Sequence, residues 1–289
     1  YFLTEESFFA AARLKSDFIV SCGSSIAGVN NLLSRDSNAK SIVILKPGLL
    51  GYGRFDLVVL PQHDEPKNKN GKNLFAITYA APNLVMEDYL KEQSEGLLKR
   101  FSHLKGNLRP KIGLFIGGNA KTVFLSQRQI RIVVRQIKEV LNEINMDILI
   151  TTSRRTPGGI EKLLVKEFKK HPNCPLLIIA NQENVPETVG GILGLSDIVI
   201  VSGDSLSMVS EAASSGKSTI VFLPEVKAKV LKGENKYEMF TERLNAQGFV
   251  LSSSVHHLGQ SIYDVAKGKI QTKKVDDNAI IFEAVRKVI

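Results

Sequence analysis

Short apolar runs rich in Val, Ile and Leu recur along the chain, and most of them end in a polar loop. Residues 41–45, 57–60 and 111–116 are three such runs. Between the runs lie segments with apolar residues at helical spacing, of which 126–144 is the longest. Short, almost wholly apolar runs are typical of strands that are buried on both faces of a parallel sheet. The alternation therefore predicts an α/β fold with right-handed crossovers.

Residues 197–224 show this pattern most completely. A β-branched strand at 197–201 is followed by a polar loop, and a helix then begins near Met208 and ends at Gly216. The polar residues of the loop are Ser202, Asp204, Ser205 and Ser207, and Glu211 lies one turn into the helix. Open α/β sheets bind anionic ligands where the carboxyl end of a strand meets the amino end of a helix. Helix capping is the alternative explanation, but the loop has more polar residues than capping needs.

Three other strands of the second half also end in polar loops. The residues that follow them are Gly117, Gly118 and Asn119 after 111–116, Thr152, Ser153, Arg154 and Arg155 after 147–150, and Asn181 after 176–180. Paired arginines beside hydroxyls suit a diphosphate, and adjacent glycines let a backbone approach a phosphate closely. Neither a GxGxxG nor a Walker pattern is present. Since the carboxyl ends of parallel strands meet at one edge, we expect the four loops to converge.

The first half contains two candidate catalytic residues. His63 and Asp64 follow the strand at 57–60, beyond Pro61. Either side chain could act as a general base or orient one. Adjacent residues of an extended chain point in opposite directions, so the two need not form a dyad. An ordinary polar strand exit explains them equally well.

The helical and strand segments divide the chain into two domains. We place the linker at about residues 104–110, which gives an N-terminal Rossmann-like domain at 1–106 and a nucleotide-binding Rossmann-like domain at 107–271. A closing helix within 272–289 is expected to pack back on the first domain. We expect parallel sheets with helices on both faces, and two domains that face a cleft.

Charge narrows the classes of partner. The 289-residue chain carries a formal net charge of +9, which favours an anionic partner such as a nucleotide, an acidic lipid surface or nucleic acid. A generally basic surface is the alternative. The sequence contains no RNA-binding aromatic motif and no zinc-finger spacing, so nucleic acid ranks low.

Cysteine usage and hydropathy indicate the cellular environment that suits the protein. Cys22 and Cys174 lie far apart without a CxxC spacing, which favours a reducing environment and argues against a structural metal. No apolar run approaches the ~20 residues of a membrane span. We therefore expect a cytoplasmic protein, and peripheral association with a membrane surface stays open as an alternative.

Three motifs, together with the strand that ends in the glycine pair Gly117–Gly118, resemble those of the mitochondrial-fission "elongate mitochondria" family. The three motifs are FDLVVLPQHD at 55–64, TTSRRTP at 151–157 and SDIVIVSGDSLSMVSEAASSGK at 196–217. The resemblance implies the two-domain GT-B fold of glycosyltransferases, in which the second domain holds a nucleotide sugar. It also implies that Glu211 holds the ribose hydroxyls.

Two features depart from the pattern of that family. Its members begin with a further strand–helix unit that carries a Pro-Gly-His element, and this unit is not seen after Tyr1. We therefore expect part of the first domain to be missing. Asn119 also follows the glycine pair where a Pro or Ser is expected. Both departures bear on catalysis more than on binding.

The leading hypothesis is metal-independent transfer of a sugar from a nucleoside-diphosphate sugar to an unknown acceptor, with no cofactor. Asp64 or His63 would deprotonate the acceptor, and arginine and helix-terminal donors would stabilise the departing diphosphate. The residues expected to bind the nucleotide sugar are Gly117, Gly118, Asn119, Thr152, Ser153, Arg154, Arg155, Asn181, Ser202, Asp204, Ser205, Ser207, Met208 and Glu211. A non-catalytic adaptor that recruits a protein partner is one alternative. An epimerase of nucleotide sugars is another.

Overall fold

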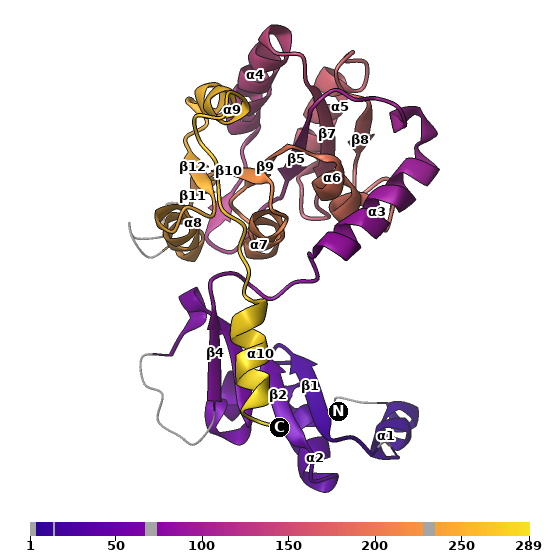
Figure 1. The fold of residues 1–289 in the computed structure, drawn as a ribbon, viewed down its shortest axis with the longest axis vertical. Coiled ribbons are helices and arrows are strands. Elements are labelled where there is room, and N and C mark those ends of the chain that lie inside the picture. The colour runs from indigo at the N-terminus through magenta and orange to yellow at the C-terminus, as the bar shows by residue number, and fades with distance from the viewer. Residues whose placement is uncertain (1–3, 14, 67–73, 228–234) are drawn as a thin grey trace. The chain divides into compact units, whose positions relative to one another are not determined.

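A computed structural model of the chain describes residues 4–13, 15–66, 74–227 and 235–289 (Figure 1). The chain forms two compact units. Unit 1 consists of Tyr1–Pro82 together with Asp276–Ile289, and unit 2 is Asn83–Val275. The predicted α/β class, with two Rossmann-like units built on parallel sheets, is confirmed.

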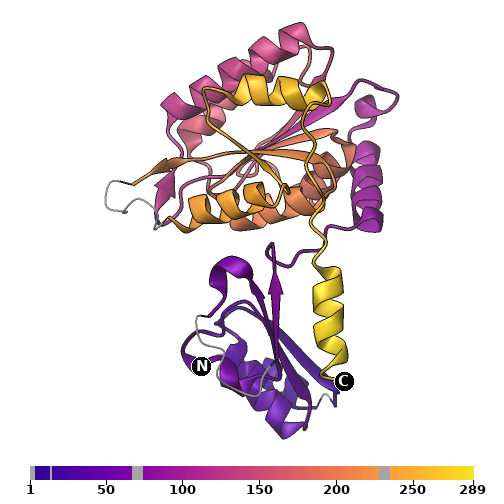
Figure 2. The same ribbon diagram turned by 60° about the vertical axis from the view of Figure 1, so that its left-hand side comes forward.

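Unit 1 is built on a four-stranded parallel sheet whose strands lie side by side in chain order. The strands are β1 (Phe18–Cys22), β2 (Lys40–Ile44), β3 (Leu57–Pro61) and β4 (Leu74–Thr78), and the helices are α1 (Glu5–Ala12), α2 (Ala27–Asp36) and α10 (Asn278–Arg286). Side chains alternate between the two faces of β3. Val58 and Leu60 pack with Ala27 of α2, whereas Leu57 and Val59 pack with Ala284 of α10. Figure 2 shows α10, in yellow, along one face of this sheet. Each face of the sheet thus has its own core.

The C-terminal helix α10 is fastened to the end of strand β4. The Asp277 carboxylate accepts the backbone N–H groups of Tyr79 and Ala80, each at 2.9 Å. Burial raises the pKa of Asp277, although these two bonds oppose the rise. The last helix of the chain therefore belongs to the unit formed by the first residues.

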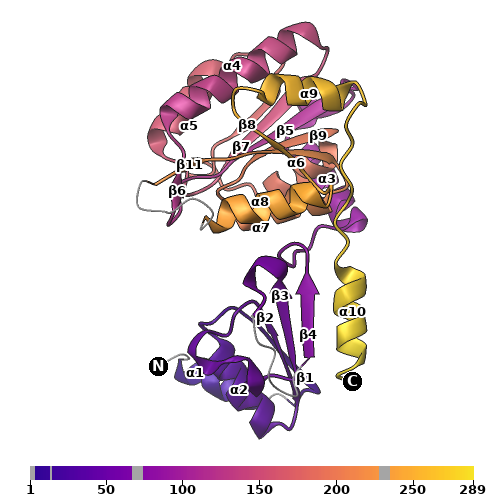
Figure 3. The same cartoon turned by 90° about the vertical axis from the view of Figure 1, so that its left-hand side faces the viewer.

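Unit 2 is built on a six-stranded parallel sheet in the order β12-β10-β9-β5-β7-β8. Its strands are β5 (Lys111–Ile116), β7 (Asp147–Thr152), β8 (Leu176–Ile178), β9 (Ile198–Ser202), β10 (Ser218–Phe222) and β12 (Leu251–Ser253); β6 (Val123–Phe124) and β11 (Glu225–Val226) form a small antiparallel pair. Its helices are α3 (Glu87–Arg100), α4 (Gln127–Glu143), α5 (Gly158–Phe168), α6 (Thr188–Leu195), α7 (Leu206–Ser214), α8 (Lys236–Ala246) and α9 (Leu258–Ala266). Helices α4, α5 and α9 cover one face of the sheet, and α6, α7 and α8 lie on the other (Figure 3).

The boundary between the units differs from the one predicted near residue 106. Helix α3 packs on α6, so it belongs to unit 2. The reason is a set of glycines on α6, since they allow the two helices to approach closely. A Cβ atom added to Gly191 would lie 2.7 Å from the Cβ atom of Leu97, and one added to Gly194 would lie 2.7 Å from the carbonyl oxygen of Leu90. This contact between distant segments is not visible in the local pattern of α3.

Within the described ranges, no helix is both long and apolar enough to cross a bilayer.

Candidate functional site

The three central strands of unit 2 end at the same edge of the sheet. Strand β5 pairs with β7 on one side and with β9 on the other. Ile116 at the end of β5 lies opposite Thr152 at the end of β7. The loops that follow the three strands are therefore brought together, and they carry most of the residues expected to bind a ligand.

Asp204 is the centre of a buried network between two of these loops. Its carboxylate is fully buried and accepts the N–H of Gly118 at 2.7 Å and the hydroxyl of Ser202 at 2.6 Å. The Ser202 hydroxyl oxygen in turn accepts the N–H of Gly117 at 2.7 Å. Burial raises the pKa of Asp204, and the bonds from Ser202 and Gly118 oppose the rise. Both glycine N–H groups are thus used inside the protein, so neither is available to a phosphate.

The glycine pair is required by the packing of the protein itself. A Cβ atom on Gly117 would lie 2.2 Å from Oδ2 of Asp204. One on Gly118 would lie 2.0 Å from the backbone carbonyl oxygen of Arg155. Since backbone cannot move aside as a flexible side chain can, only glycine fits at position 118. These glycines were expected to contact a ligand, whereas their neighbours in the structure are Asp204 and Arg155.

The two arginines after β7 differ in their surroundings. Arg155 pairs with Oδ2 of Asp204 at 3.6 Å and donates to the carbonyl oxygen of Asn119 at 3.4 Å. Arg154 is exposed, and its guanidinium has no hydrogen bond or ion pair with any described residue. Arg154 is therefore the arginine that is available to an anion, while Arg155 is held in place by Asp204.

Thr156 and Tyr237 are two residues of this edge that the sequence analysis missed. The buried Thr156 hydroxyl donates to the carbonyl oxygen of Gly117 and accepts the N–H of Ser153 at 3.0 Å. Tyr237, on α8, is near enough for the charges of Arg155 and Asp204 to act on its phenol, and burial raises its pKa. Thr156 stands inside the TTSRRTP motif and could have been included. Tyr237 is distant in the sequence, and no local signal marks it.

Helix α7 begins at the same edge and carries Glu211. Ser205 caps the helix and accepts the N–H of Met208 at 3.5 Å, and Ser207 is exposed in the first turn. The Glu211 side chain is half-buried, its partial desolvation raises its pKa, and no described residue donates a hydrogen bond to it. A desolvated carboxylate without a donor is a costly arrangement for the protein alone. Glu211 is therefore the residue of the edge that most clearly lacks a partner.

The polar groups after β8 are used within the protein. Asn181 donates to Oε1 of the buried Glu161 at 2.7 Å. Thr152 accepts the N–H of Ala180 at 3.0 Å. These bonds fix the loop beside the β7 loop, and they leave the amide of Asn181 already engaged.

His63 and Asp64 lie in unit 1, in the 3-10 turn Gln62–Asp64 that follows β3. The Asp64 carboxylate pairs with Nζ of Lys46 at 2.8 Å. To act as a base, Asp64 would first have to separate from Lys46.

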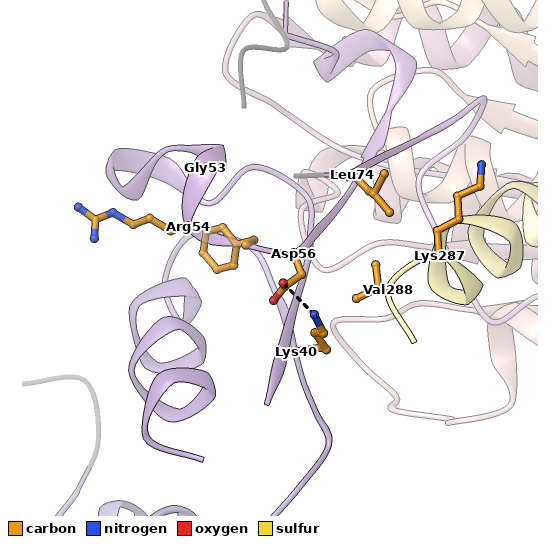
Figure 4. A pocket seen from close by; sticks show the side chains of 8 residues that line it. Lys40, Gly53, Arg54, Asp56, Leu74, Lys287 and Val288 are labelled. Atoms are coloured by element: carbon orange, nitrogen blue, oxygen red, sulfur yellow. Dashed lines mark ion pairs between the residues drawn. The ribbon is translucent and has the colours of Figure 1, made fainter. Parts of the chain in front are cut away.

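A polar hollow of about 350 Å³ lies at the opposite, amino edge of the unit 1 sheet (Figure 4). Asp56 pairs there with Lys40 at 3.6 Å and accepts the N–H of Ser41 at 2.8 Å. Burial acts to raise the pKa of Asp56, but the Ser41 bonds and Lys40 outweigh it, so the pKa is lowered. Among the charged residues that line this hollow, Lys40 and Asp56 pair with each other, and the hollow lies at the other edge of the sheet from His63. In the described part of the chain, no cluster of three or more His, Cys, Asp or Glu is arranged to hold a metal.

Comparison with known proteins identifies a family and a curated relative. A model of the family described as "Mitochondrial fission ELM1" matches residues 3–289. Uncharacterized protein RP120 of Rickettsia prowazekii (strain Madrid E) is 25% identical over 240 residues, which are 73% of this chain and 66% of that protein. The chain thus spans just under two thirds of the length of this relative.

Solved structures share the fold. A candidate UDP-N-acetylglucosamine 2-epimerase from Listeria monocytogenes matches with a TM-score of 0.59 at 12% identity, over 97% of this chain and 76% of that chain. The UDP-GlcNAc 2-epimerase from Neisseria meningitidis, bound to UDP-GlcNAc, has a TM-score of 0.55 at 14% identity, over 96% and 78%. Phytolacca americana UGT2, complexed with UDP-2fluoro-glucose and pterostilbene, has a TM-score of 0.50 at 9% identity, over 97% and 72%. At these identities the likeness shows the fold alone, which is GT-B-like.

Proposed function

The chain belongs to the mitochondrial fission ELM1 family, and we propose that it binds a nucleoside-diphosphate sugar at the carboxyl edge of the unit 2 sheet and transfers the sugar to an acceptor. The observation that carries the proposal is Glu211. Its carboxylate is partly desolvated and lacks a donor among the described residues, one turn into the helix that starts at this edge. The two hydroxyls of a ribose would supply the missing hydrogen bonds.

The diphosphate would lie against Arg154 and the first turn of α7. Arg154 is free to form a bidentate pair with phosphate oxygens. The amino end of α7 offers the positive end of a helix dipole, with the Ser205 and Ser207 hydroxyls beside it. Gly117 and Gly118 would shape the loop without donating to the phosphate, since Ser202 and Asp204 accept their N–H groups.

Transfer of the sugar requires stabilisation of the departing diphosphate. As the bond to the sugar breaks, negative charge grows on the diphosphate, and Arg154 with the α7 dipole would stabilise it electrostatically. This arrangement would not require a metal. The acceptor hydroxyl would give its proton to His63 or Asp64 of unit 1, and for Asp64 this follows release from Lys46.

An epimerase of nucleotide sugars is a second candidate, because two of the structural neighbours carry that name. It would use the same nucleotide site, so nucleotide binding alone does not separate the two. The product does. A transferase releases the free nucleoside diphosphate when an acceptor is present, whereas an epimerase converts the nucleotide sugar into its stereoisomer without releasing the diphosphate.

The nucleotide site can be tested by calorimetric titration of the full chain with UDP, GDP, ADP and CDP. At least one of them should bind, and Arg154→Ala should weaken that binding about ten-fold or more, as expected for a lost charged hydrogen bond. Arg131→Ala is the matched control, because Arg131 is also exposed but lies on the outer face of α4. Absence of affinity for all four nucleotides would contradict the proposal.

If Arg154→Ala and Glu211→Ala both leave cellular function unchanged, the adaptor alternative is favoured.

A further inference from the structure

Helices α4 and α5 carry a dense array of positive charge. Four cations of α4 recur at spacings of three and four residues, which places them along one side of the helix. Four more follow on α5 and the turn that ends it. We call these eight the α4–α5 basic surface: Arg128, Arg131, Arg135, Lys138, Lys162, Lys166, Lys169 and Lys170.

Few acids balance this surface. The acids of the same two helices that reach solvent are Glu139, Glu143 and Glu167; the fourth, Glu161, is buried and bonded to Asn181. Two ion pairs form, Lys138 with Glu167 at 3.0 Å and Arg135 with Glu139 at 3.8 Å. The other six cations have no acidic partner among the described residues. The surface therefore contributes a large part of the chain's net charge of +9.

The two helices are neighbours, so their charges act together. The Lys138–Glu167 ion pair joins α4 to α5. A hollow of about 360 Å³ lies between them, with Val134 and Leu163 in its wall beside Arg131 and Arg135. The hydrogen bond from Lys138, with Lys166 and Arg131 nearby, lowers the pKa of Glu167, which shows how positive this region is.

Folding does not explain the array. Like charges at helical spacing destabilise a helix, and α4 is already held to the sheet by its buried apolar side, which includes Ile130, Val133 and Ile137. An external partner with dense negative charge would offset the repulsion. No aromatic side chain on α4 or α5 is exposed, so the surface offers no stacking platform for a single-stranded nucleic acid. Clusters of four to eight Lys and Arg on an amphipathic helix are typical of contact with anionic lipids.

We propose that the α4–α5 basic surface docks unit 2 on a membrane rich in anionic phospholipid. This inference goes beyond the proposed nucleotide site, which lies at the edge of the sheet and uses other residues. A failure of either one leaves the other standing. Binding would be electrostatic and reversible, and raised salt would weaken it.

The test is co-sedimentation of the full chain with vesicles of phosphatidylcholine, with and without phosphatidylserine. The variant Arg131→Gln/Lys162→Gln/Lys166→Gln/Lys169→Gln removes four cations that have no ion pair among the described residues. Each removal should weaken binding about five-fold, so the variant should no longer sediment with the serine-containing vesicles. The control is Lys91→Gln/Lys99→Gln/Lys105→Gln/Lys267→Gln, which removes the same charge from exposed positions elsewhere in unit 2 and should bind as the parent does.

Three results would overturn the proposal. In the first, the parent chain sediments equally with the two kinds of vesicle. In the second, the control variant loses as much binding as the α4–α5 variant. In the third, duplex DNA binds the parent more tightly than the vesicles do at the same salt concentration, which would identify a nucleic-acid surface instead. Circular dichroism and calorimetric binding of the nucleoside diphosphate serve as checks on folding, and both variants should retain the parent's signal.

Discussion

The carboxyl edges of the two sheets are built differently. In unit 2 the polar groups after β5, β7 and β9 bind one another across the edge, and their centre, Asp204, is fully buried. In unit 1 the corresponding Asp64 is held by one ion pair with Lys46, whose side chain is 53% exposed while that of Asp64 is 28% exposed. A buried network fixes geometry, whereas an exposed ion pair can open at little cost. The polar loops at the edge of the unit 2 sheet are thus held in one geometry by the protein itself. The Asp64 carboxylate of unit 1 is held only by an ion pair that can open.

The two sheet edges should differ most in the loss of stability that follows removal of the Asp204 or the Asp64 carboxylate. Asp204→Ala leaves the Gly118 N–H, the Ser202 hydroxyl and the Arg155 guanidinium without their partner, and it should lower the free energy of unfolding by about 3 kcal/mol. Asp64→Ala breaks only a partly exposed ion pair, so the loss should stay below about 1 kcal/mol. Chemical denaturation measures both. Equal losses would show that the two edges do not differ in rigidity.

The glycine pair gives the next contrast. Gly118→Ala drives a Cβ atom into the Arg155 backbone and should destabilise the chain by about 2–3 kcal/mol, because that backbone cannot move aside. Gly158→Ala is the matched control, since a Cβ atom there meets nothing within 4 Å, and it should change stability by about 0.5 kcal/mol or less. Thermal unfolding of both variants tests this. A tolerated alanine at 118 would mean that the loop is not held as the structure has it.

Glu211→Gln should raise the stability of the chain near neutral pH and lower its affinity for a nucleotide. Since burial raises the folded-state pKa of Glu211, its ionised carboxylate reduces stability, and the reduction grows as pH rises through that pKa. The variant should therefore melt above the parent near neutral pH, and the difference should vanish below about pH 4, where both states carry the protonated acid. Nucleotide affinity should fall about ten-fold or more, since an amide accepts the ribose hydroxyls less strongly than a carboxylate does. Unchanged melting at neutral pH would contradict the assigned environment of Glu211.

Much of the fold could be predicted from the sequence because its signals are local. The apolar periodicity of α4 and the β-branched runs of the strands are visible within a few residues, and the three quoted motifs resemble the family that the family model then confirmed. The domain boundary could not be predicted, because α3 is assigned to unit 2 by its contact with glycines of α6, roughly a hundred residues later.

The convergence of the polar loops was predictable, but the hydrogen bonds within them were not. Parallel strands bring their carboxyl ends together, so the convergence of the β5, β7 and β9 loops follows from topology. Which of these polar groups already have a hydrogen-bond partner depends on interatomic distances. The spacing of residues in the sequence does not reveal those distances. Asn181 is engaged by Glu161, and Gly118 by Asp204, whereas Arg154 and Glu211 have no such partner among the described residues. Among the charged residues expected to bind a ligand, Arg154 and Glu211 are therefore the two without a partner in the described part of the chain.

The most direct test of the central claim is a crystal structure of the full chain with whichever nucleoside diphosphate binds in calorimetry. Ribose hydroxyls should lie within roughly 2.6–3.2 Å of the Glu211 carboxylate. The diphosphate should lie between Arg154 and the first turn of α7. A nucleotide bound elsewhere, or one at this edge that leaves Glu211 without a contact, would contradict the central claim.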